Sequence, residues 1–234
     1  MLEENSDWLV VGKPVPLIMH PTGKSEEVTL LGVLKRAMRG EEFFFVNRLD
    51  RETSGCVLVA KSGKVARRLG KMMGRREIKK GYEAIVRGWP NWDEVTIKSG
   101  LRRKGEFTES AIWVRQAVHA EGKESETEFV VKRKFENARG KFCVVACRPR
   151  TGRTHQIRVH LEFAGFPIVG DKIYGGDEEA YLDFLRDGWT PELQERLILD
   201  RQALHASWMK FSWEGRAVQV RCPLTDDLVS FRIA

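Results

Sequence analysis

The sequence predicts a single α+β domain over residues 1–234, in which helices flank a largely antiparallel, mixed β-sheet. The first observation is size and composition: 234 residues, 42% hydrophobic and 31% charged, are enough for a sizeable core and typical of a folded globular protein. Second, four apolar or alternating runs lie between residues 82 and 147, joined by polar turns without helix caps. Third, no internal repeat, low-complexity segment or linker divides the chain.

Residues 1–80 are predicted to form short buried strands and two helices. The expected strands cover residues 8–11, 43–45 and 56–60. One helix is expected over residues 28–40, closed by Gly40. A second begins after Ser62, a residue type that caps helix N-termini. Its apolar positions recur at helical spacing: Val65, Leu69, Met72 and Met73.

The rest of the chain continues with the antiparallel block and then with helices. The four runs of the block cover residues 82–86, 111–114, 128–135 and 142–147. Helical spacing returns at Ile157, Leu161 and Ala164 and ends at Gly165. An acidic helix is expected over residues 178–199, and two strands, 208–213 and 217–222, close the chain.

Composition argues against several classes of protein. No stretch approaches the roughly 20 apolar residues of a membrane span, and the acidic start is unlike a signal peptide, so we expect a cytoplasmic protein. The 4 cysteines are too sparse for a disulfide framework, which favours reduced thiols in a core. Cys143 and Cys147 lie four residues apart in an expected strand, roughly 13 Å, too far for joint metal ligation. We therefore expect no metal site, and the sequence contains no phosphate-binding loop of the nucleotide-hydrolase type.

The net charge of +7 is unevenly distributed. Residues 61–80 hold nine basic side chains and one acidic one, whereas residues 171–200 are strongly acidic. On the helix after Ser62, the basic side chains cluster away from the apolar stripe: Lys64, Arg67, Arg68, Lys71 and Arg75. Such a patch attracts polyanions, most often nucleic acid. A solvated helix face is the simpler alternative.

The segment VNRLDRETSG, residues 46–55, is the first with unusual chemistry. Asp50 lies between Arg48 and Arg51, and two neighbouring cations favour an ionised carboxylate. An ionised carboxylate suits a nucleophile or a stabiliser of developing positive charge better than a general acid. The alternative is a surface aspartate that caps a turn made by Ser54 and Gly55.

A second segment, RPRTGRTHQIRVHLEFAGFPIVG, delivers four arginines to the start of the helix near Ile157: Arg148, Arg150, Arg153 and Arg158. Helical geometry makes His155 and Arg158 project away from the apolar stripe of that helix. Backbone amides at a helix start together with arginine side chains form a receptor for phosphate or carboxylate. A solvated basic face is again the alternative.

These segments carry a family resemblance. VNRLDRETSGCVLVAKS resembles the HRLDRxTSG signature of the RluA-type RNA pseudouridine synthases, and IKKGYEAIVRG resembles the KxYxAxVxG segment of that family. RPRTGRTHQIRVHLEFAGFPIVGDKIYG and the LHA of residues 204–206 are similar to two further motifs. The similarity runs from about Trp8 to Pro223. Three positions depart from the pattern: Asn47 replaces a His, Gly12 replaces an Asn, and SWEG stands where a His-Pro is usual.

The resemblance implies a pseudouridine synthase fold and the isomerisation of uridine to pseudouridine in tRNA or large-subunit rRNA, without a cofactor or metal. It implies that Asp50 is the catalytic aspartate, Arg158 its ion-pair partner, and Tyr82 the ring that stacks on the target base and is a candidate acceptor of the carbon 5 proton. Arg48 would fill the gap left by the flipped uridine. The implied contacts to the RNA come from the basic helix and from Arg150, Arg153 and His155.

Further expectations concern organisation and alternatives. The pattern starts within ten residues of Met1, so we do not expect the small N-terminal RNA-binding domain of many family members. We also expect a monomer. A non-catalytic RNA-binding or RNA-folding module is the competing hypothesis, and a DNA-base glycosylase is a third. The combination of Asp50, Tyr82 and Arg158 argues against a pure binder, which needs none of them. The sequence leaves open whether Asp50 attacks the sugar, attacks the base or removes a proton.

Overall fold

The computed structural model describes residues 1–21, 28–176 and 178–233. The chain forms two compact units, each assembled from separate stretches of sequence. Residues 1–81 and 205–226 make up the first unit, and residues 82–204 and 227–234 the second. The chain passes between them within two strands and one helix, β5 (Lys79–Arg87), β10 (Leu204–Trp213) and α6 (Asp226–Ile233). The predicted single catalytic domain stays a prediction.

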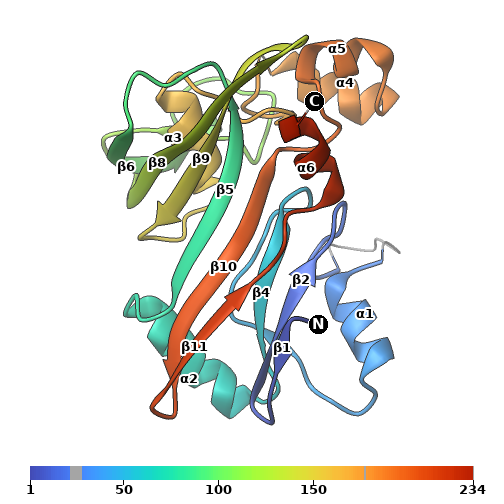
Figure 1. Cartoon of the computed structure of the whole chain (residues 1–234), viewed down its shortest axis with the longest axis vertical. Coiled ribbons are helices and arrows are strands. Elements are labelled where there is room, and N and C mark those ends of the chain that lie inside the picture. Colours follow the sequence, from blue (N-terminus) through green and yellow to red (C-terminus); the bar gives the residue numbers. More distant parts are fainter. Residues whose placement is uncertain (22–27, 177, 234) are drawn as a thin grey trace. The chain divides into compact units, whose positions relative to one another are not determined.

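The first unit is a sheet with the strand order β1-β2-β4-β10; β11 pairs with β10, and β3 with β4. Figure 1 shows β2, β4 and β10 side by side. Pairing is antiparallel except between β4 and β10, where His205 lies opposite Ser54 in parallel register. The elements of this unit are β1 (Glu3–Glu4), β2 (Trp8–Lys13), α1 (Leu30–Ala37), β3 (Phe44–Phe45), β4 (Ser54–Ala60), α2 (Gly63–Gly74) and β11 (Arg216–Arg221).

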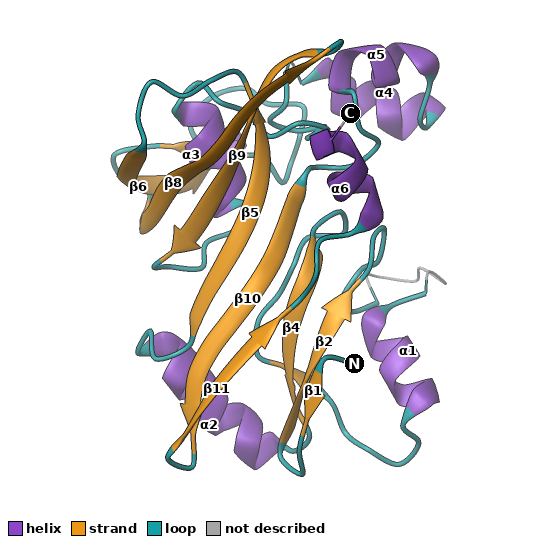
Figure 2. Ribbon diagram, viewed as in Figure 1, coloured by secondary structure: helices purple, strands orange, loops and turns teal. Residues whose placement is uncertain are grey.

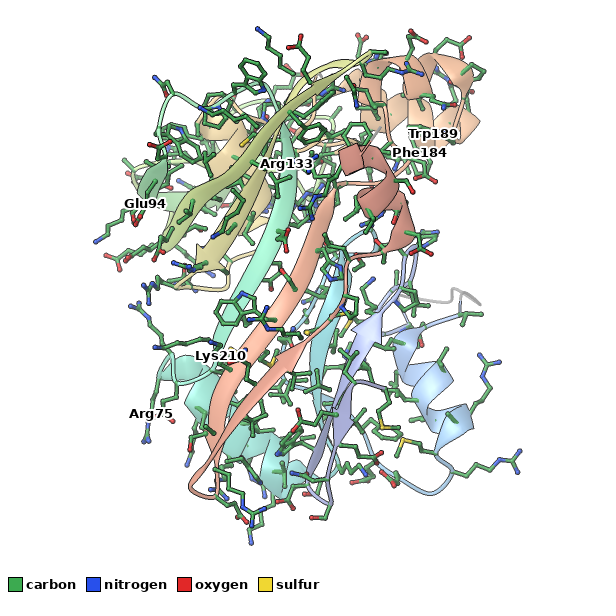
Figure 3. All side chains as sticks on the ribbon, in the orientation of Figure 1. Arg75, Glu94, Arg133, Phe184, Trp189 and Lys210 are labelled. Carbon is green, nitrogen blue, oxygen red and sulfur yellow. The ribbon has the colours of Figure 1, made fainter. Side chains whose placement is uncertain are left out.

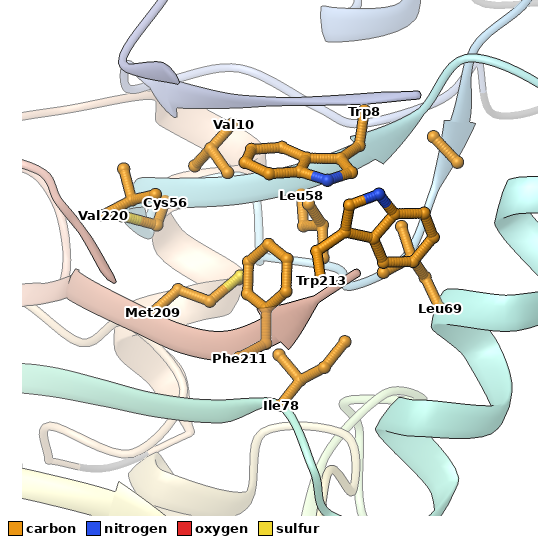
Figure 4. Close-up of a cluster of buried hydrophobic side chains, with 11 residues drawn as sticks. Trp8, Val10, Cys56, Leu58, Leu69, Ile78, Met209, Phe211, Trp213 and Val220 are labelled. Carbon is orange, nitrogen blue, oxygen red and sulfur yellow. The ribbon is translucent and has the colours of Figure 1, made fainter. Parts of the chain in front are cut away.

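Helix α2 forms as predicted. The Ser62 hydroxyl caps it by accepting the Val65 N–H at 3.3 Å. Leu69 is fully buried in a core cluster, with Trp8 on β2 and Phe211 on β10 packed edge to face at 5.1 Å (Figure 4). Because the apolar stripe of α2 lies on this core, its opposite face is left for charged side chains.

The second unit is an antiparallel sheet with the order β5-β9-β8-β6-β7. Figure 2 labels four of these strands, β5, β9, β8 and β6. The predicted α+β class with a largely antiparallel sheet is thereby confirmed. The other elements of this unit are β6 (Glu94–Arg103), a 3₁₀ turn (Lys104–Glu106), β7 (Gln116–Val118), β8 (Lys123–Asn137), β9 (Gly140–Pro149), α3 (Gln156–Phe163), α4 (Glu179–Asp187) and α5 (Pro191–Leu197).

Two predicted elements of the second unit were wrong. Residues 111–114 form a turn rather than a strand, closed by the Arg115 N–H, which donates to the Ile112 carbonyl at 3.1 Å. The acidic helix expected over residues 178–199 is two helices, because Gly188 at φ +75° ends α4, and Thr190 and Pro191 begin α5. Phe184 on α4 and Trp189 in the link between α4 and α5 (both labelled in Figure 3) place their rings 4.5 and 5.4 Å from the ammonium of the buried Lys172.

Candidate active site

In the first unit, Asp50 lies half-buried on the loop that leads into β4. Buried side chains, Leu49 and Thr53, precede and follow it, and the Thr53 N–H donates to the Asp50 carbonyl at 3.1 Å. Arg48 and Arg51, predicted to flank the carboxylate, are both exposed. The loop therefore has a fixed backbone with arginines on its outer side.

Lys13 at the end of β2 anchors this loop. Its side chain is only 1% exposed, and its ammonium donates to the carbonyls of Arg51 at 3.0 Å, Leu17 at 2.8 Å and Pro14 at 3.0 Å. The Arg51 carbonyl also accepts the Leu17 N–H at 3.1 Å. Hydrogen bonds from a buried charged donor are stronger than those between neutral groups, so Lys13 fixes the backbone next to Asp50.

The C-terminal end of the loop is fixed against β10. The His205 Nε2 lies 3.1 Å from the Cys222 carbonyl, which can only accept, so in the neutral ring Nδ1 accepts from the Ser54 hydroxyl at 2.8 Å. At Gly55, φ is +113°, and a Cβ would lie 2.3 Å from the Ala206 carbonyl oxygen. Only glycine allows β4 to approach β10 this closely.

Asn47, which replaces the histidine of the family pattern, is buried and joins the loop to β4. Its amide donates to the Cys56 carbonyl at 3.3 Å, and its oxygen accepts the Leu58 N–H at 2.8 Å. The Asn47 side chain thus bonds to the β4 backbone as a neighbouring strand would, donating one hydrogen bond and accepting another. Asn47 therefore orients the start of the Asp50 loop.

In the second unit, β5 carries Tyr82 opposite Cys147 on β9, and the Tyr82 side chain is mostly buried. Helix α3 carries Arg158, only 5% exposed. A solvated basic face is therefore excluded for Arg158. The predicted pair between Asp50 and Arg158 stays a prediction.

Arg158 forms a bidentate ion pair with Asp171, which is 0% exposed. Its Nε and Nη2 donate to the two carboxylate oxygens at 2.6 and 2.8 Å. Burial alone would raise the pKa of Asp171, but the charge and hydrogen bonds of Arg158 and the N–H groups of Tyr174 and Ile173 hold the pKa below its usual value. Arg158, one of the four arginines of the predicted receptor for phosphate or carboxylate, thus binds a carboxylate of the chain itself.

Tyr174 connects this ion pair to His155. The Tyr174 ring lies 4.9 Å from the Arg158 guanidinium, and its hydroxyl accepts the Gln116 N–H at 2.9 Å. The Tyr174 hydroxyl also forms a hydrogen bond with the Nδ1 of His155, at 2.9 Å. His155 adopts the left-handed region at φ 56°, where strained residues are concentrated at functional sites.

The other arginines of this segment lie at the end of β9 and on the turn that follows it, which Gln156 stabilises. The Gln156 side-chain oxygen accepts from the Thr151 hydroxyl at 2.7 Å and from the Arg153 N–H at 3.0 Å. Arg148 and Arg150 pair with the two oxygens of the Glu128 carboxylate, and Arg150, Arg153 and Arg148 are all exposed. The turn is ordered and basic.

Helix α2 and the turn between β10 and β11 line a cavity of about 530 Å³. All five basic residues predicted on this helix line it: Lys64, Arg67, Arg68, Lys71 and Arg75. Figure 3 shows Arg75 directed outward. Two carboxylates, Glu77 and Glu214, also line the cavity, and Glu214 pairs with the Arg68 guanidinium at 3.2 Å. This basic groove therefore has a surplus of positive charge.

Sequence reasoning missed four residues that shape the site: Lys13, Asp171, Tyr174 and Gln156. Three of them stand in the motifs already quoted, within GDKIYG and THQIR, but no residue-level argument indicated their contacts. Among residues 1–21, 28–176 and 178–233, no group of three His, Cys, Asp or Glu side chains is placed to hold a metal ion. The same residues include no helix long and apolar enough to cross a membrane.

Comparison with known proteins identifies the chain's relatives. The sequence pattern of the family described as RNA pseudouridylate synthase matches residues 7–163. The chain is 36% identical to human pseudouridylate synthase RPUSD2, covering 88% of this chain and 36% of that protein. It is 32% identical to ribosomal large subunit pseudouridine synthase D of Vibrio cholerae, covering 99% of this chain and 69% of that protein.

A solved structure agrees with these sequence matches. Human RNA pseudouridylate synthase domain containing 1 is similar with a TM-score of 0.74 and 27% identity, covering 97% of this chain and 84% of that one. The resemblance of the motifs, the family pattern and the fold all agree, and the predicted enzyme class is confirmed. The chain belongs to the RNA pseudouridylate synthase family, whose members isomerise uridine to pseudouridine in RNA.

Proposed function

We propose that this protein isomerises uridine to pseudouridine in large-subunit ribosomal RNA, with Asp50 as its catalytic carboxylate. The observation that carries the assignment is the fixed Asp50 loop, which Lys13 anchors through the Arg51 carbonyl. Preorganised groups lower a barrier because they need not reorganise during the reaction. The name of the Vibrio cholerae relative favours ribosomal over transfer RNA.

The chemistry requires a carboxylate and a proton acceptor. The bond from ribose carbon 1 to nitrogen 1 breaks, a bond to carbon 5 forms, carbon 5 loses a proton and nitrogen 1 gains one, so no electrons are exchanged with a cofactor. An ionised Asp50 would stabilise positive charge at the sugar or bond to the ring, as carboxylates do in glycosidases. Tyr82 would stack on the flipped base and accept the proton from carbon 5.

Arg158 would be the ion-pair partner of Asp50. Its Nε and Nη2 already bind Asp171, which fixes the guanidinium plane. A guanidinium held in this way is a rigid partner for a second carboxylate, because no side-chain freedom remains to be lost. Arg48, exposed on the Asp50 loop, would fill the space of the flipped uridine.

The exposed basic residues would hold the RNA backbone. The basic groove, Arg150, Arg153 and His155 would contact phosphates, which position RNA without reading its sequence. Replacing both Arg67 and Lys71 with alanine should lower the slope of log affinity against log salt by about 1.4–1.8. The matched control replaces Lys35 and Arg36, two exposed cations of α1, and should leave the slope unchanged. An unchanged slope in the groove variant would show that this face is merely solvated.

The test of substrate is pseudouridine mapping of total RNA from cells that lack the protein, complemented with the wild type or with Asp50→Asn. We expect sites in large-subunit ribosomal RNA that return with the wild type only. Sites confined to transfer RNA would overturn the choice of substrate, and the absence of any changed site would overturn the activity.

We also propose that the protein acts in the cytoplasm as a monomer. The four cysteines, all free thiols, support a reducing compartment. Light scattering on the purified protein and fractionation of cells test these two points. A stable dimer or a membrane-bound fraction would contradict them.

A further inference from the structure

An exposed tryptophan on a rigid turn stands outside the residues already discussed. Trp113 is 75% exposed, more than any other large hydrophobic side chain that the structure describes. It lies in the turn between Ile112 and Arg115. Exposing so large an apolar ring is unfavourable, which suggests a bound state that covers it.

The turn is anchored on both sides of Trp113. Ile112 is buried in a cluster with Leu101, Val159 and Ile173. Arg115 donates to the Ile173 carbonyl at 2.8 Å and to the Glu162 carboxylate at 2.6 Å. The backbone that carries the ring is therefore anchored on both sides.

One face of the ring is covered by a cation. The Arg103 guanidinium lies 3.6 Å from the centre of the Trp113 ring, and the Glu106 carboxylate lies 3.3 Å from Arg103. Proteins that bind unpaired nucleic acid combine aromatic rings, on which bases stack, with arginines that add cation–π contacts. A tryptophan on an anchored turn, with an arginine on one face, can offer its other face to a base.

The same turn leads into the network around Arg158. Gln116 follows Arg115 in the chain, and its N–H donates to the Tyr174 hydroxyl, whose ring lies against Arg158. Three residues span at most about 10 Å, so the Trp113 backbone lies within that distance of Gln116. A base on Trp113 would thus lie near the network around Arg158, which the proposed function assigns to the catalytic machinery.

We propose that Trp113, backed by Arg103, is a stacking platform for an unpaired base of the RNA substrate that flanks the target uridine. This inference rests on the proposed function for the identity of the ligand as RNA. The platform selects unpaired over paired RNA, because a base inside a duplex cannot offer a free face to the ring.

The test compares Trp113→Ala and Trp113→Phe with the wild type. The control is Trp89→Ala, since Trp89 is also an exposed tryptophan, 41% exposed, with the Lys141 ammonium 4.5 Å from its ring. The probes are a synthetic RNA hairpin with 2-aminopurine in its loop and a duplex of the same stem. Thermal melts verify that each variant is folded.

We expect Trp113→Ala to weaken binding of the hairpin by about five- to 150-fold and binding of the duplex by less than about twofold. In the wild type, stacking on Trp113 should quench the fluorescence of the 2-aminopurine in the hairpin loop, and Trp113→Ala should abolish this binding-induced quenching. Trp113→Phe should restore most of the affinity, and Trp89→Ala should bind both probes as the wild type does.

An equal loss on both probes, or hairpin binding within about twofold of the wild type, would overturn the platform. A change of oligomeric state in Trp113→Ala with unchanged RNA binding would overturn it too, in favour of contact between copies of the chain. Because binding is measured without turnover, the outcomes separate: Trp113-dependent hairpin binding without pseudouridine formation supports the platform and refutes the proposed function.

Discussion

Replacing Asp171 with asparagine tests whether the buried ion pair with Arg158 organises the second unit. Asparagine keeps the shape and an oxygen that can accept the N–H groups of Ile173 and Tyr174, each now 3.0 Å from Asp171 Oδ1. The substitution removes the negative charge and leaves the Arg158 guanidinium, 5% exposed, without its counter-charge. Removing one partner of a buried pair costs about 3–5 kcal/mol.

The expected readout is a large fall in thermal stability. For a chain of this size, each kcal/mol lowers the melting temperature by about 2–4 °C, so Asp171→Asn should melt roughly 6–20 °C below the wild type. The control is Asp183→Asn, because Asp183 also pairs with two arginines, Arg186 and Arg196, but on the surface. Surface pairs contribute little, and this variant should melt within about 2 °C of the wild type.

A double variant separates stability from activity. Arg158→Met combined with Asp171→Leu removes both charges, and replacing a buried pair with apolar residues is often neutral. We expect most of the lost stability to return, whereas pseudouridine formation is lost because the proposed function requires Arg158. Equal melting temperatures for Asp171→Asn and Asp183→Asn would refute the view that this pair is buried and structural.

Three further substitutions test other parts of the account. Burial lowers the pKa of His160 from about 6.5 to about 4, so between these pH values the unfolded chain binds a proton that the folded chain does not. About 3 kcal/mol of stability should therefore be lost as the pH falls from 6.5 to 4. Urea titrations over this pH range should show a smaller loss of stability in His160→Gln. Lys13→Met should lower the free energy of unfolding by about 3 kcal/mol in the same urea titration and slow turnover, since buried carbonyls lose their donor. Wild-type stability and wild-type turnover in this variant would contradict the anchoring role. Gly55→Ala should destabilise by at least about 2 kcal/mol in the same titration, from strained φ and a clash with Ala206, and a stable variant would show that β4 can move away.

The sequence predicts elements well where the determinants are local. Ser62 and the apolar spacing around Leu69 define α2 within one segment, and the structure agrees. The strand predicted over residues 111–114 was wrong because an apolar run does not show which of its side chains are buried. Ile112 is buried, whereas Trp113 is exposed to solvent. The strand β6 was not predicted, although Val95, Ile97 and Leu101 alternate with mostly polar residues along it.

For the candidate site too, the sequence predicts what local patterns determine and misses contacts between distant segments. Motif resemblance singles out Asp50, Tyr82 and Arg158 as residues, but their supporting contacts depend on segments distant in sequence. Lys13 reaches the Arg51 carbonyl 38 residues away, and no local pattern indicates this. The partner of Arg158 within its own unit, Asp171, was missed because a buried bidentate pair requires knowledge of where the chain returns after α3.

The most direct test of the central claim is the release of tritium from RNA transcribed with 5-tritiated uridine, because the carbon 5 hydrogen leaves when the new bond to the sugar forms. Under single-turnover conditions, wild-type protein should release the label. Asp50→Asn should slow release by at least about 10³-fold, or roughly 4 kcal/mol in activation free energy, with RNA affinity within about threefold. Release by Asp50→Asn within tenfold of the wild-type rate would contradict the assignment of Asp50 as the catalytic carboxylate.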